Sequence, residues 1–290
     1  MLLKDFQILS VFWGDKHVEW FEKATLNSLA FPQNKEALLN ATWNIFTEEK
    51  YFERIDEIVN QKVKLKKLNI IDIKKLYDRI DILHSGLIWQ MHKCFELKEK
   101  MLLAPPDTIF GDGTISNLLK IGWEPGSCVV VAHPRVLPII LGEIYQSNES
   151  LVSASIKHFH KSWSDAEVGH PRQNGFIGGV SWQYLDKETI SVCHRLPTVY
   201  LADFQEQDLK YFENRIGFGS YDHEWPSDHL INQERMRFVG SSDACFICEI
   251  TDAGANIPPV QLNQDPNKFW RNVLHNKIDS QFRAIFRKGA

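Results

Sequence analysis

Two acidic residues follow an apolar segment in the first half of the chain, and their side chains could bind a cation. Residues 102–110 are predicted to form a strand, and Asp107 and Asp112 lie at its end beside Gly111 and Gly113. Sheets of α/β proteins usually bind ligands at the carboxyl ends of their strands. Carboxylates there suit Mg²⁺ or Mn²⁺, and glycine lets phosphates come close. We therefore predict a metal-assisted nucleotide site, with a tight turn as the alternative explanation.

Three further segments contain residue types that could take part in chemistry. His194 follows a strand predicted at 189–192 and is a candidate site residue, with a hydrogen-bonded core histidine as the alternative. Arg135 follows a strand predicted at 128–132, where a guanidinium could bind phosphate. Residues 221–229 (YDHEWPSDH) hold two aspartates, a glutamate and two histidines, which are hard to explain as a core element. A surface loop with a helix cap is the other interpretation of that cluster.

The composition is that of an ordinary globular protein. The 290 residues are 43% hydrophobic and 24% charged, with a formal net charge of −4 and no basic block, which argues against bulk nucleic-acid binding. No apolar stretch approaches the roughly 18 residues of a membrane span, and the amino terminus lacks the pattern of a cleavable signal. The five cysteines are odd in number and scattered. We therefore expect reduced thiols in a cytoplasmic protein.

The order of the predicted elements indicates an α/β fold. Strands are predicted at 6–12, 41–47, 102–110 and 128–132, and helices at 17–29, 51–61, 71–100 and 116–121. A lysine-rich run at 62–75 is expected to form a solvated helix face and its flanking turn. Because strands and helices alternate, the pattern favours a mainly parallel sheet with helices on both faces.

The second half of the chain has a different pattern. Short strands are predicted at 175–182, 189–192 and 198–202, another lies within 238–250, and 269–286 is predicted to form an amphipathic terminal helix. No internal repeat or linker separates the two halves. We therefore predict a single domain at 1–290, with a nucleotide-binding half at 1–135 and an acceptor-side half at 136–290.

The order of elements that leads into residues 102–113 (LLAPPDTIFGDG) resembles that of GT-A type glycosyltransferases. That family places an Asp-x-Asp motif at the end of such a strand, often within LDADTIF. Asp107 falls on the second aspartate, and Pro105 replaces the first. The resemblance implies a Rossmann-type mixed, mainly parallel sheet flanked by helices, with a smaller C-terminal elaboration. It also implies that Asp107 binds the cation that bridges the nucleotide diphosphate, and Asp112 could compensate for the missing aspartate.

The resemblance also implies residues that bind the nucleotide-sugar donor. Phe12, Trp13 and Gly14 lie where the family encloses the nucleobase, and the Trp13 ring could stack on it. Thr47 ends the second strand, where the family brings a side chain to the base or the ribose. Arg135 could help to balance the phosphate charge.

On the acceptor side, many members of that family take a late metal ligand, often a histidine, and a catalytic carboxylate from the C-terminal region. The resemblance makes His223 or Asp222 the candidate ligand, and Asp222, Glu224 or Asp228 the candidate general base, although Asp228 fits a helix cap better. His194 is a further candidate catalytic residue.

Together these residues predict a glycosyltransferase that moves a sugar from a UDP- or GDP-sugar to an acceptor hydroxyl with divalent-metal assistance. The acceptor would be a glycan, a protein or a lipid-linked saccharide. The alternatives are another metal-dependent nucleotide enzyme, such as a nucleotidyltransferase or phosphohydrolase, and a non-catalytic carbohydrate-binding protein. The sequence contains no GxGxxG after its first strand, which disfavours a nicotinamide enzyme, and it contains no GxSxG or HExxH motif.

Overall fold

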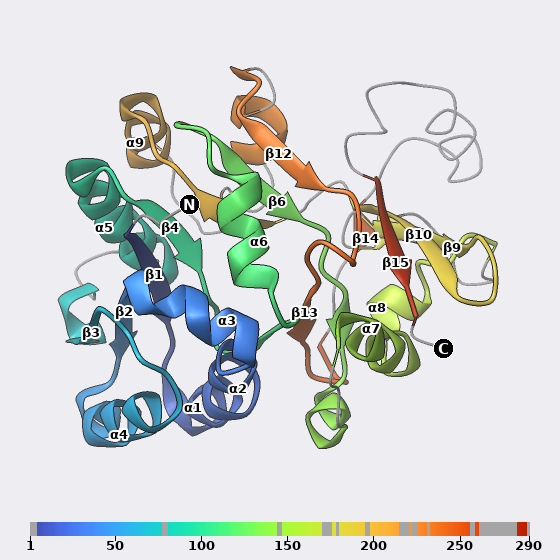
Figure 1. The fold of residues 1–290 in the computed structure, drawn as a ribbon, viewed down its shortest axis with the longest axis horizontal. Helices are drawn as coiled ribbons and strands as arrows, with labels where there is room; N and C mark the ends of the chain where they lie inside the picture. Colours follow the sequence, from blue (N-terminus) through green and yellow to red (C-terminus); the bar gives the residue numbers. More distant parts are fainter. Residues whose placement is uncertain are drawn as a thin grey trace. The chain divides into compact units, whose positions relative to one another are not determined.

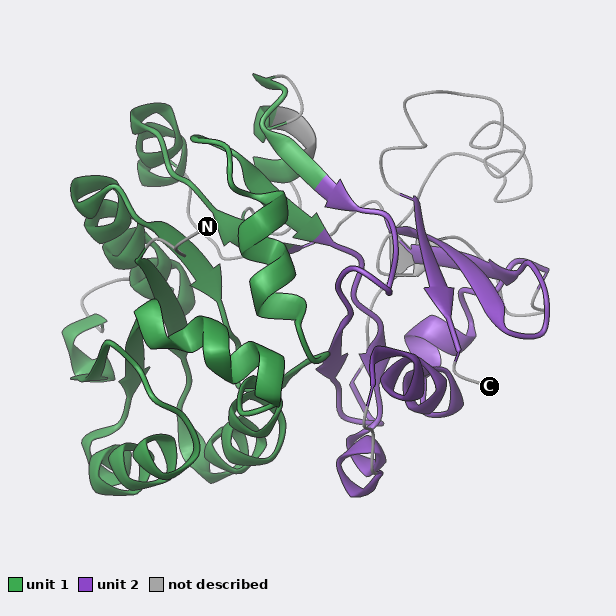
Figure 2. Ribbon diagram, viewed as in Figure 1, with its two compact units in different colours: residues 1–130, 199–237 green, residues 131–198, 238–290 purple. Residues whose placement is uncertain are grey.

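The computed structural model describes most of the chain as two compact units. The described residues are 5–76, 81–143, 147–169, 176–177, 180–194, 198–214, 221, 225–230, 233–255, 259–260 and 283–288. Unit 1 comprises Met1–Val130 and Val199–Arg237, and unit 2 comprises Val131–Thr198 and Phe238–Ala290 (Figure 2). Residues 199–237 thus return to the unit that contains the amino-terminal strands. The single domain at 1–290 stays a prediction.

A seven-stranded mixed sheet forms the centre of unit 1 (Figure 1). Its strands are β1 (Phe6–Val11), β2 (Ala41–Thr47), β3 (Lys67–Asp72), β4 (Lys100–Leu103), β6 (Cys128–Val131), β11 (Thr198–Ala202) and β12 (Met236–Val239). They are ordered β12-β6-β11-β4-β1-β2-β3. β1 pairs in parallel with β2 and β4, and β2 with β3, whereas β11 runs antiparallel to β4. The predicted mixed, mainly parallel α/β sheet is confirmed.

Helices pack on both faces of β1. The helices of unit 1 are α1 (Gly14–Trp20), α2 (Asn27–Leu29), α3 (Pro32–Ala37), α4 (Phe52–Lys62), α5 (Ile82–Leu97), α6 (Thr114–Ile121) and α9 (Glu206–Glu213), with π-helical turns at Phe21–Leu26 and Trp225–Leu230. Phe21, in the turn between α1 and α2, packs on Trp43 with 5.4 Å between ring centroids, and the Trp43 indole donates to Ser10 Oγ at 3.0 Å. Val11 points to the opposite face because side chains alternate along a strand. There Val11 lies against α5, close to Gly86.

The lysine-rich run contains a strand rather than the predicted helix. Residues 67–72 form β3, which pairs in parallel with β2 from Thr42↔Lys67 to Thr47↔Asp72. Asn69 donates its side-chain amide to Asn44 Oδ1 at 2.8 Å. Residues 68–72 are all partly buried, and the apolar Leu68, Ile70 and Ile71 fit a half-buried strand. Lys67 lies at its start, and the edge of a sheet tolerates charge. The helix therefore begins later than predicted, at Ile82.

The strand predicted at 102–110 is two strands. β4 ends at Leu103 and β5 (Thr108–Phe110) begins after a turn. Pro105 and Pro106 have no backbone N–H to donate to a ladder, so they interrupt the strand between its two apolar runs. Asp107 therefore lies in the turn itself.

In its described residues, unit 2 contains short strands and two α-helices. They are β7 (Arg135–Val136), β8 (Phe176–Ile177), β9 (Val180–Tyr184), β10 (Thr189–His194), β13 (Ile247–Ile250), β14 (Pro259–Val260), β15 (Arg283–Arg287), α7 (Asn148–Lys157) and α8 (Lys161–Ser164). β9, β10 and β15 form an antiparallel sheet, and β7 pairs in parallel with β13. The predicted terminal helix at 269–286 is wrong at its end, since 283–287 is a strand with Ala284 and Phe286 buried on one face. The remainder of that prediction lies outside the described residues.

The cysteines are buried thiols, and none of the five forms a disulfide. Burial raises the pKa of Cys94, Cys128, Cys245 and Cys248 to about 12, which disfavours the reactive thiolate.

None of the helices within the described ranges has both the length and the apolar composition needed to cross a membrane.

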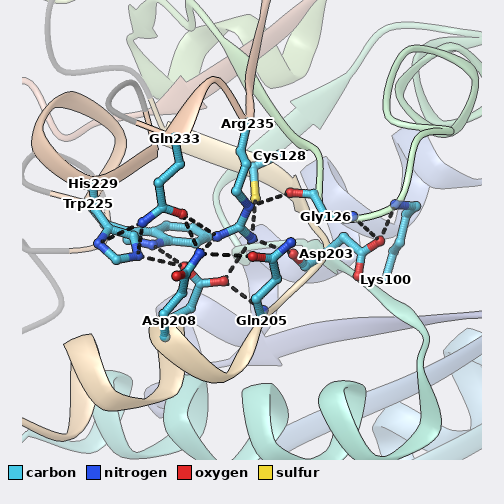
Figure 3. Close-up of polar contacts among 11 residues, drawn as sticks. Lys100, Gly126, Cys128, Asp203, Gln205, Asp208, Trp225, His229, Gln233 and Arg235 are labelled. Atoms are coloured by element: carbon cyan, nitrogen blue, oxygen red, sulfur yellow. Dashed lines mark hydrogen bonds and ion pairs between the residues drawn. The ribbon is translucent and has the colours of Figure 1, made fainter.

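A buried ion pair holds the returning segment of unit 1. Figure 3 shows the Arg235 guanidinium facing both carboxylate oxygens of Asp208, and each of the two hydrogen bonds is 2.8 Å long. Asp208 has no exposed side-chain surface. It also accepts from the Trp225 indole at 3.1 Å and from the Gln205 backbone N–H at 2.7 Å. Both charged groups of this pair are thus hydrogen-bonded, as a stable buried ion pair requires.

The same network reaches the amino end of β4. Arg235 Nε donates to the Gly126 carbonyl at 2.6 Å, and the Gly126 N–H donates to Asp203 Oδ2 at 2.8 Å. Lys100, the first residue of β4, pairs with that same oxygen at 2.7 Å. The network therefore lies at the sheet edge opposite the carboxyl end of β4, and we assign it to stability.

We expect Arg235→Met to destabilise unit 1 by about 3–5 kcal/mol, because the substitution leaves the buried Asp208 carboxylate without its counter-ion. Urea unfolding followed by circular dichroism measures the free energy of unfolding. Lys210→Met removes the exposed pair with Glu206 and is the control, for which little change is expected. Equal effects of the two substitutions would contradict the assignment.

The contact of Gly86 with Val11 gives a second prediction. A Cβ atom at Gly86 would lie 2.8 Å from Val11 Cγ2, so Gly86→Ala overpacks the interface between α5 and β1. In a Val11→Ala background the same substitution should be less harmful by about 1 kcal/mol or more, because the conflicting methyl groups are gone. A double-mutant cycle of unfolding free energies measures this coupling, and additive effects would contradict the close contact.

Candidate functional site

Four strand ends meet at one edge of the unit 1 sheet. β1, β2, β3 and β4 are parallel, so the segments that follow them lie at the same edge. These segments are 12–15, 48–51, 73–76 and 104–107. The carboxyl edge of a parallel sheet is where α/β proteins place their ligands, and the candidate site is built here.

Hydrogen bonds connect the ends of β1 and β2. Gly14, with φ of +76°, begins α1 and donates its N–H to Glu48 Oε2 at 2.8 Å. The Tyr51 hydroxyl donates to Asp15 Oδ1 at 2.5 Å, and this hydrogen bond raises the pKa of Tyr51. Lys50 lies 3.3 Å from the other Glu48 oxygen. The positive φ favours glycine at position 14, so the backbone there is fixed both by its conformation and by the Glu48 carboxylate.

A cavity of about 430 Å³ lies at the ends of β2 and β3, which is within the usual size range of ligand sites. It is lined by Glu48, Glu49, Lys50, Asp72, Ile73 and Lys74. Ile73 is fully buried. Asp72 closes the strand by accepting the Lys74 N–H on Oδ1 at 3.0 Å. The β3 part of this cavity was not predicted from the sequence, because the lysine-rich run was assigned to a helix.

Thr25 fixes the turn that contains Asp107. It lies in the π-helical turn Phe21–Leu26, just before α2. Thr25 Oγ1 lies 2.5 Å from the Pro105 carbonyl oxygen and 3.0 Å from that of Thr108, and it accepts the Thr108 N–H at 3.3 Å. The Ala104 N–H continues the ladder to the Leu9 carbonyl at 2.9 Å. Asp107 is half-buried. Its backbone position at the carboxyl end of β4 is thus well fixed.

Asp112 has a structural contact of its own. Its Oδ1 accepts the backbone N–H groups of Gln33 at 2.9 Å, Asn34 at 3.3 Å and Gly113 at 3.0 Å. It therefore caps the start of α3. Among the described residues, no three His, Cys, Asp or Glu side chains form a group that could hold a metal ion. His223 lies outside these residues, so the predicted set of Asp107, Asp112 and His223 stays a prediction.

The other predicted donor residues differ in exposure. Trp13 is 38% exposed, whereas Phe12 is 1% exposed and stacks on Phe21 with ring centroids 4.7 Å apart. Thr47 is fully buried, and its Oγ1 has no hydrogen-bond partner among the described residues. Phe12 is thus a core residue behind the site, and Trp13 is the aromatic side chain that a ligand can reach.

Asp222, His223 and Glu224 lie outside the described residues. The residues on either side of them are buried: Tyr221 donates its hydroxyl to the Val199 carbonyl at 2.8 Å and stacks on Trp225 with 5.2 Å between centroids. The roles predicted for these three residues stay predictions.

Arg135 and His194 belong to a polar cluster within unit 2. Arg135 Nε lies 3.4 Å from Glu249 Oε1, and His133 Nε2 lies 3.5 Å from Glu249 Oε2. The His133 and His194 rings are 5.0 Å apart. Glu249, the one charged residue in the apolar run 245–250, was not among the predicted site residues, although a lone charge within a buried strand is a usable signal. The predicted phosphate and catalytic roles of Arg135 and His194 stay predictions.

Charges in this cluster shift two pKa values. Burial alone would raise the pKa of the Glu249 carboxyl, but the hydrogen bond to His133 and the charge of Arg135 outweigh burial and hold the pKa well below 4.5. Burial and the charge of Arg135 lower the pKa of His160, which caps α8. The cluster is therefore arranged to keep Glu249 ionised.

Comparison with known proteins shows distant likenesses of fold. No family model and no curated protein matches the sequence. Apo mouse xyloside xylosyltransferase 1 aligns at a TM-score of 0.34 with 11% identity over 47% of this chain and 54% of that one. TarS from S. aureus aligns at 0.32 with 14% identity over 50% and 39% of the two chains. Core-mannan synthase A from Aspergillus fumigatus, in a Mn/GDP form, aligns at 0.37 with 11% identity over 81% and 72%.

The alignment covers 54% of the xylosyltransferase chain and 39% of the TarS chain, so this chain spans about half or less of their length. At such scores and identities the likenesses assign no activity.

The pKa of Glu249 predicts an acid-dependent loss of stability in unit 2. A carboxyl whose pKa is lower in the folded state stabilises the protein above its unfolded pKa, and this contribution is lost as the pH falls toward the folded value. The stability advantage of the natural protein over Glu249→Gln should thus shrink between about pH 5 and pH 3. Urea unfolding across this range measures it, with exposed Glu188→Gln as the control, and a pH-independent difference would contradict the cluster's charge arrangement.

Proposed function

We propose that the protein is a glycosyltransferase whose nucleotide-sugar donor binds at the carboxyl edge of the unit 1 sheet. The observation that carries the proposal is the cavity at the ends of β2 and β3, on the same sheet edge as the exposed Trp13 ring and the Asp107 turn. An indole face suits stacking on a planar base. Asp107 is proposed to act on the phosphate side of the donor, as its position in the family's motif implies.

The reaction requires that the protein stabilise the leaving diphosphate and remove a proton from the acceptor hydroxyl. The bond between the sugar carbon and the diphosphate oxygen breaks, and a bond to the acceptor oxygen forms. Negative charge builds up on the leaving diphosphate, and a divalent cation, when bound, stabilises that charge. Asp107 is the residue proposed to hold it. Because the described residues do not complete a metal site, the proposal depends on where Asp107 lies and not on a particular ligand set.

The acceptor hydroxyl must lose its proton as it attacks. Asp222, Glu224 and His194 are the residues proposed to accept it. We propose that the acceptor is a glycan, a protein or a lipid-linked saccharide. We also propose that the protein is cytoplasmic.

The test is incubation with UDP- and GDP-sugars, with and without Mn²⁺ or Mg²⁺. We expect slow release of nucleoside diphosphate and free sugar, and Asp107→Ala should reduce the rate about 10²-fold or more, since it removes a group that acts on developing charge. Asp56→Asn, on the exposed face of α4, is the control and should leave the rate unchanged. Coupled enzymatic detection of the nucleoside diphosphate gives the rate.

Two results would contradict the proposal. Release of pyrophosphate from a nucleoside triphosphate, without hydrolysis of any nucleotide sugar, would indicate a nucleotidyltransferase. Binding of a saccharide that persists in Asp107→Ala and requires no nucleotide would indicate a non-catalytic carbohydrate-binding protein.

A further inference from the structure

The cavity at the ends of β2 and β3 places hydrogen-bond acceptors beside hydrogen-bond donors. Glu48 is already engaged by the Gly14 N–H and by Lys50. Asp72 uses Oδ1 for the Lys74 N–H. Within the described ranges, Asp72 Oδ2 and the Lys74 ammonium have no side-chain partner, although both residues line the cavity. The Asp72 carboxylate can still accept further hydrogen bonds, at Oδ2 and at the second lone pair of Oδ1. A ligand can therefore meet this carboxylate and an open ammonium group in the same cavity.

Such a pair of groups discriminates between nucleobases. An ionised carboxylate only accepts hydrogen bonds and an ammonium only donates them. The pairing edge of guanine presents the acceptor O6 beside two adjacent donors, N1–H and the N2 amino group. Uracil presents one donor between two carbonyl oxygens, and adenine and cytosine present one amino group beside an acceptor nitrogen. Guanine is thus the base that can give a carboxylate two hydrogen bonds and still offer an acceptor to the ammonium.

The cavity is also placed to receive a base. Trp13 precedes Gly14, whose N–H contacts Glu48 in the cavity wall, so the exposed indole is one peptide away from that contact. Fully buried Ile73 supplies an apolar group among the charged residues. A planar base could therefore stack on Trp13 and contact Ile73, while the charged side chains of the cavity form hydrogen bonds with its polar edge.

We infer that this cavity selects guanine: Asp72 accepts from N1–H and N2–H₂ of the base, and Lys74 donates to O6, so the donor is a GDP-sugar. The inference rests on the proposed function, which it narrows from nucleotide sugars in general to those of guanosine.

Isothermal titration with GDP, inosine diphosphate, UDP, ADP and CDP tests the inference. GDP should bind about tenfold more tightly than inosine diphosphate, which lacks the N2 amino group, because one hydrogen bond to a charged group is lost. GDP should exceed UDP, ADP and CDP by at least that factor. In Asp72→Asn the difference between GDP and inosine diphosphate should disappear.

The Asp72→Asn variant is suited to this test because the asparagine Oδ1 can still accept the Lys74 N–H, which preserves the turn after β3. Lys74→Met should weaken GDP and inosine diphosphate to the same extent, since both carry O6. Asp56→Asn is the charge-matched control and should bind like the natural protein. Circular dichroism confirms that each variant is folded.

The outcomes separate this inference from the proposed function. Equal affinity for GDP and UDP, or an unchanged preference for GDP in Asp72→Asn, would overturn the inference and leave a nucleotide-sugar enzyme. If no nucleoside diphosphate binds and no nucleotide sugar is hydrolysed, the proposed function fails and the inference fails with it.

Discussion

The parallel pairing of β1 with β2 on one side and β4 on the other is the constraint on which the rest of unit 1 depends. β1 is buried on both faces, with Ser10 hydrogen-bonded to Trp43 on one face and Val11 packed against α5 on the other. A slip of one residue would exchange these faces, so burial fixes the register. Because the register is fixed, the segments after the strands emerge at one edge, and Trp13, Glu48, Asp72 and Asp107 share it.

The structural network and the proposed donor site lie at different edges of this sheet. The pair of Asp208 and Arg235 and its neighbours lie at the amino end of β4, with every charge satisfied by short hydrogen bonds. At the carboxyl edge, by contrast, Thr47 has a buried oxygen without a partner among the described residues, and Asp72 and Lys74 have groups that a ligand could satisfy. Polar groups without a protein partner at the carboxyl edge are typical of a binding site, whereas a fully hydrogen-bonded network at the opposite edge is typical of a structural one.

The sequence predicted elements well where local pattern decides them. β1 and β2 were predicted within one residue, because their apolar residues form uninterrupted runs between clear turn signals. β3 was missed because the lysines around it were assigned to a helix face, although residues 68–72 are compatible with a half-buried strand; the pairing with β2 confirms the strand. The two strands around Pro105 and Pro106 could have been separated, since proline cannot continue a ladder. The contacts of Asp208 with Arg235, and of Glu249 with His133, join segments far apart in sequence, so no local pattern identifies the partners.

Hydrogen–deuterium exchange of the full chain with and without a saturating nucleoside diphosphate tests the central claim most directly, because it shows which strand ends a donor nucleotide covers. The account predicts slowed exchange in peptides that contain Trp13 to Asp15, Glu48 to Tyr51, Asp72 to Leu76 and Pro105 to Gly113. It predicts no change around Gly126 or Gln205 at the opposite edge. Protection confined to that opposite edge, or to unit 2 alone, would contradict a donor site at the carboxyl edge of the unit 1 sheet.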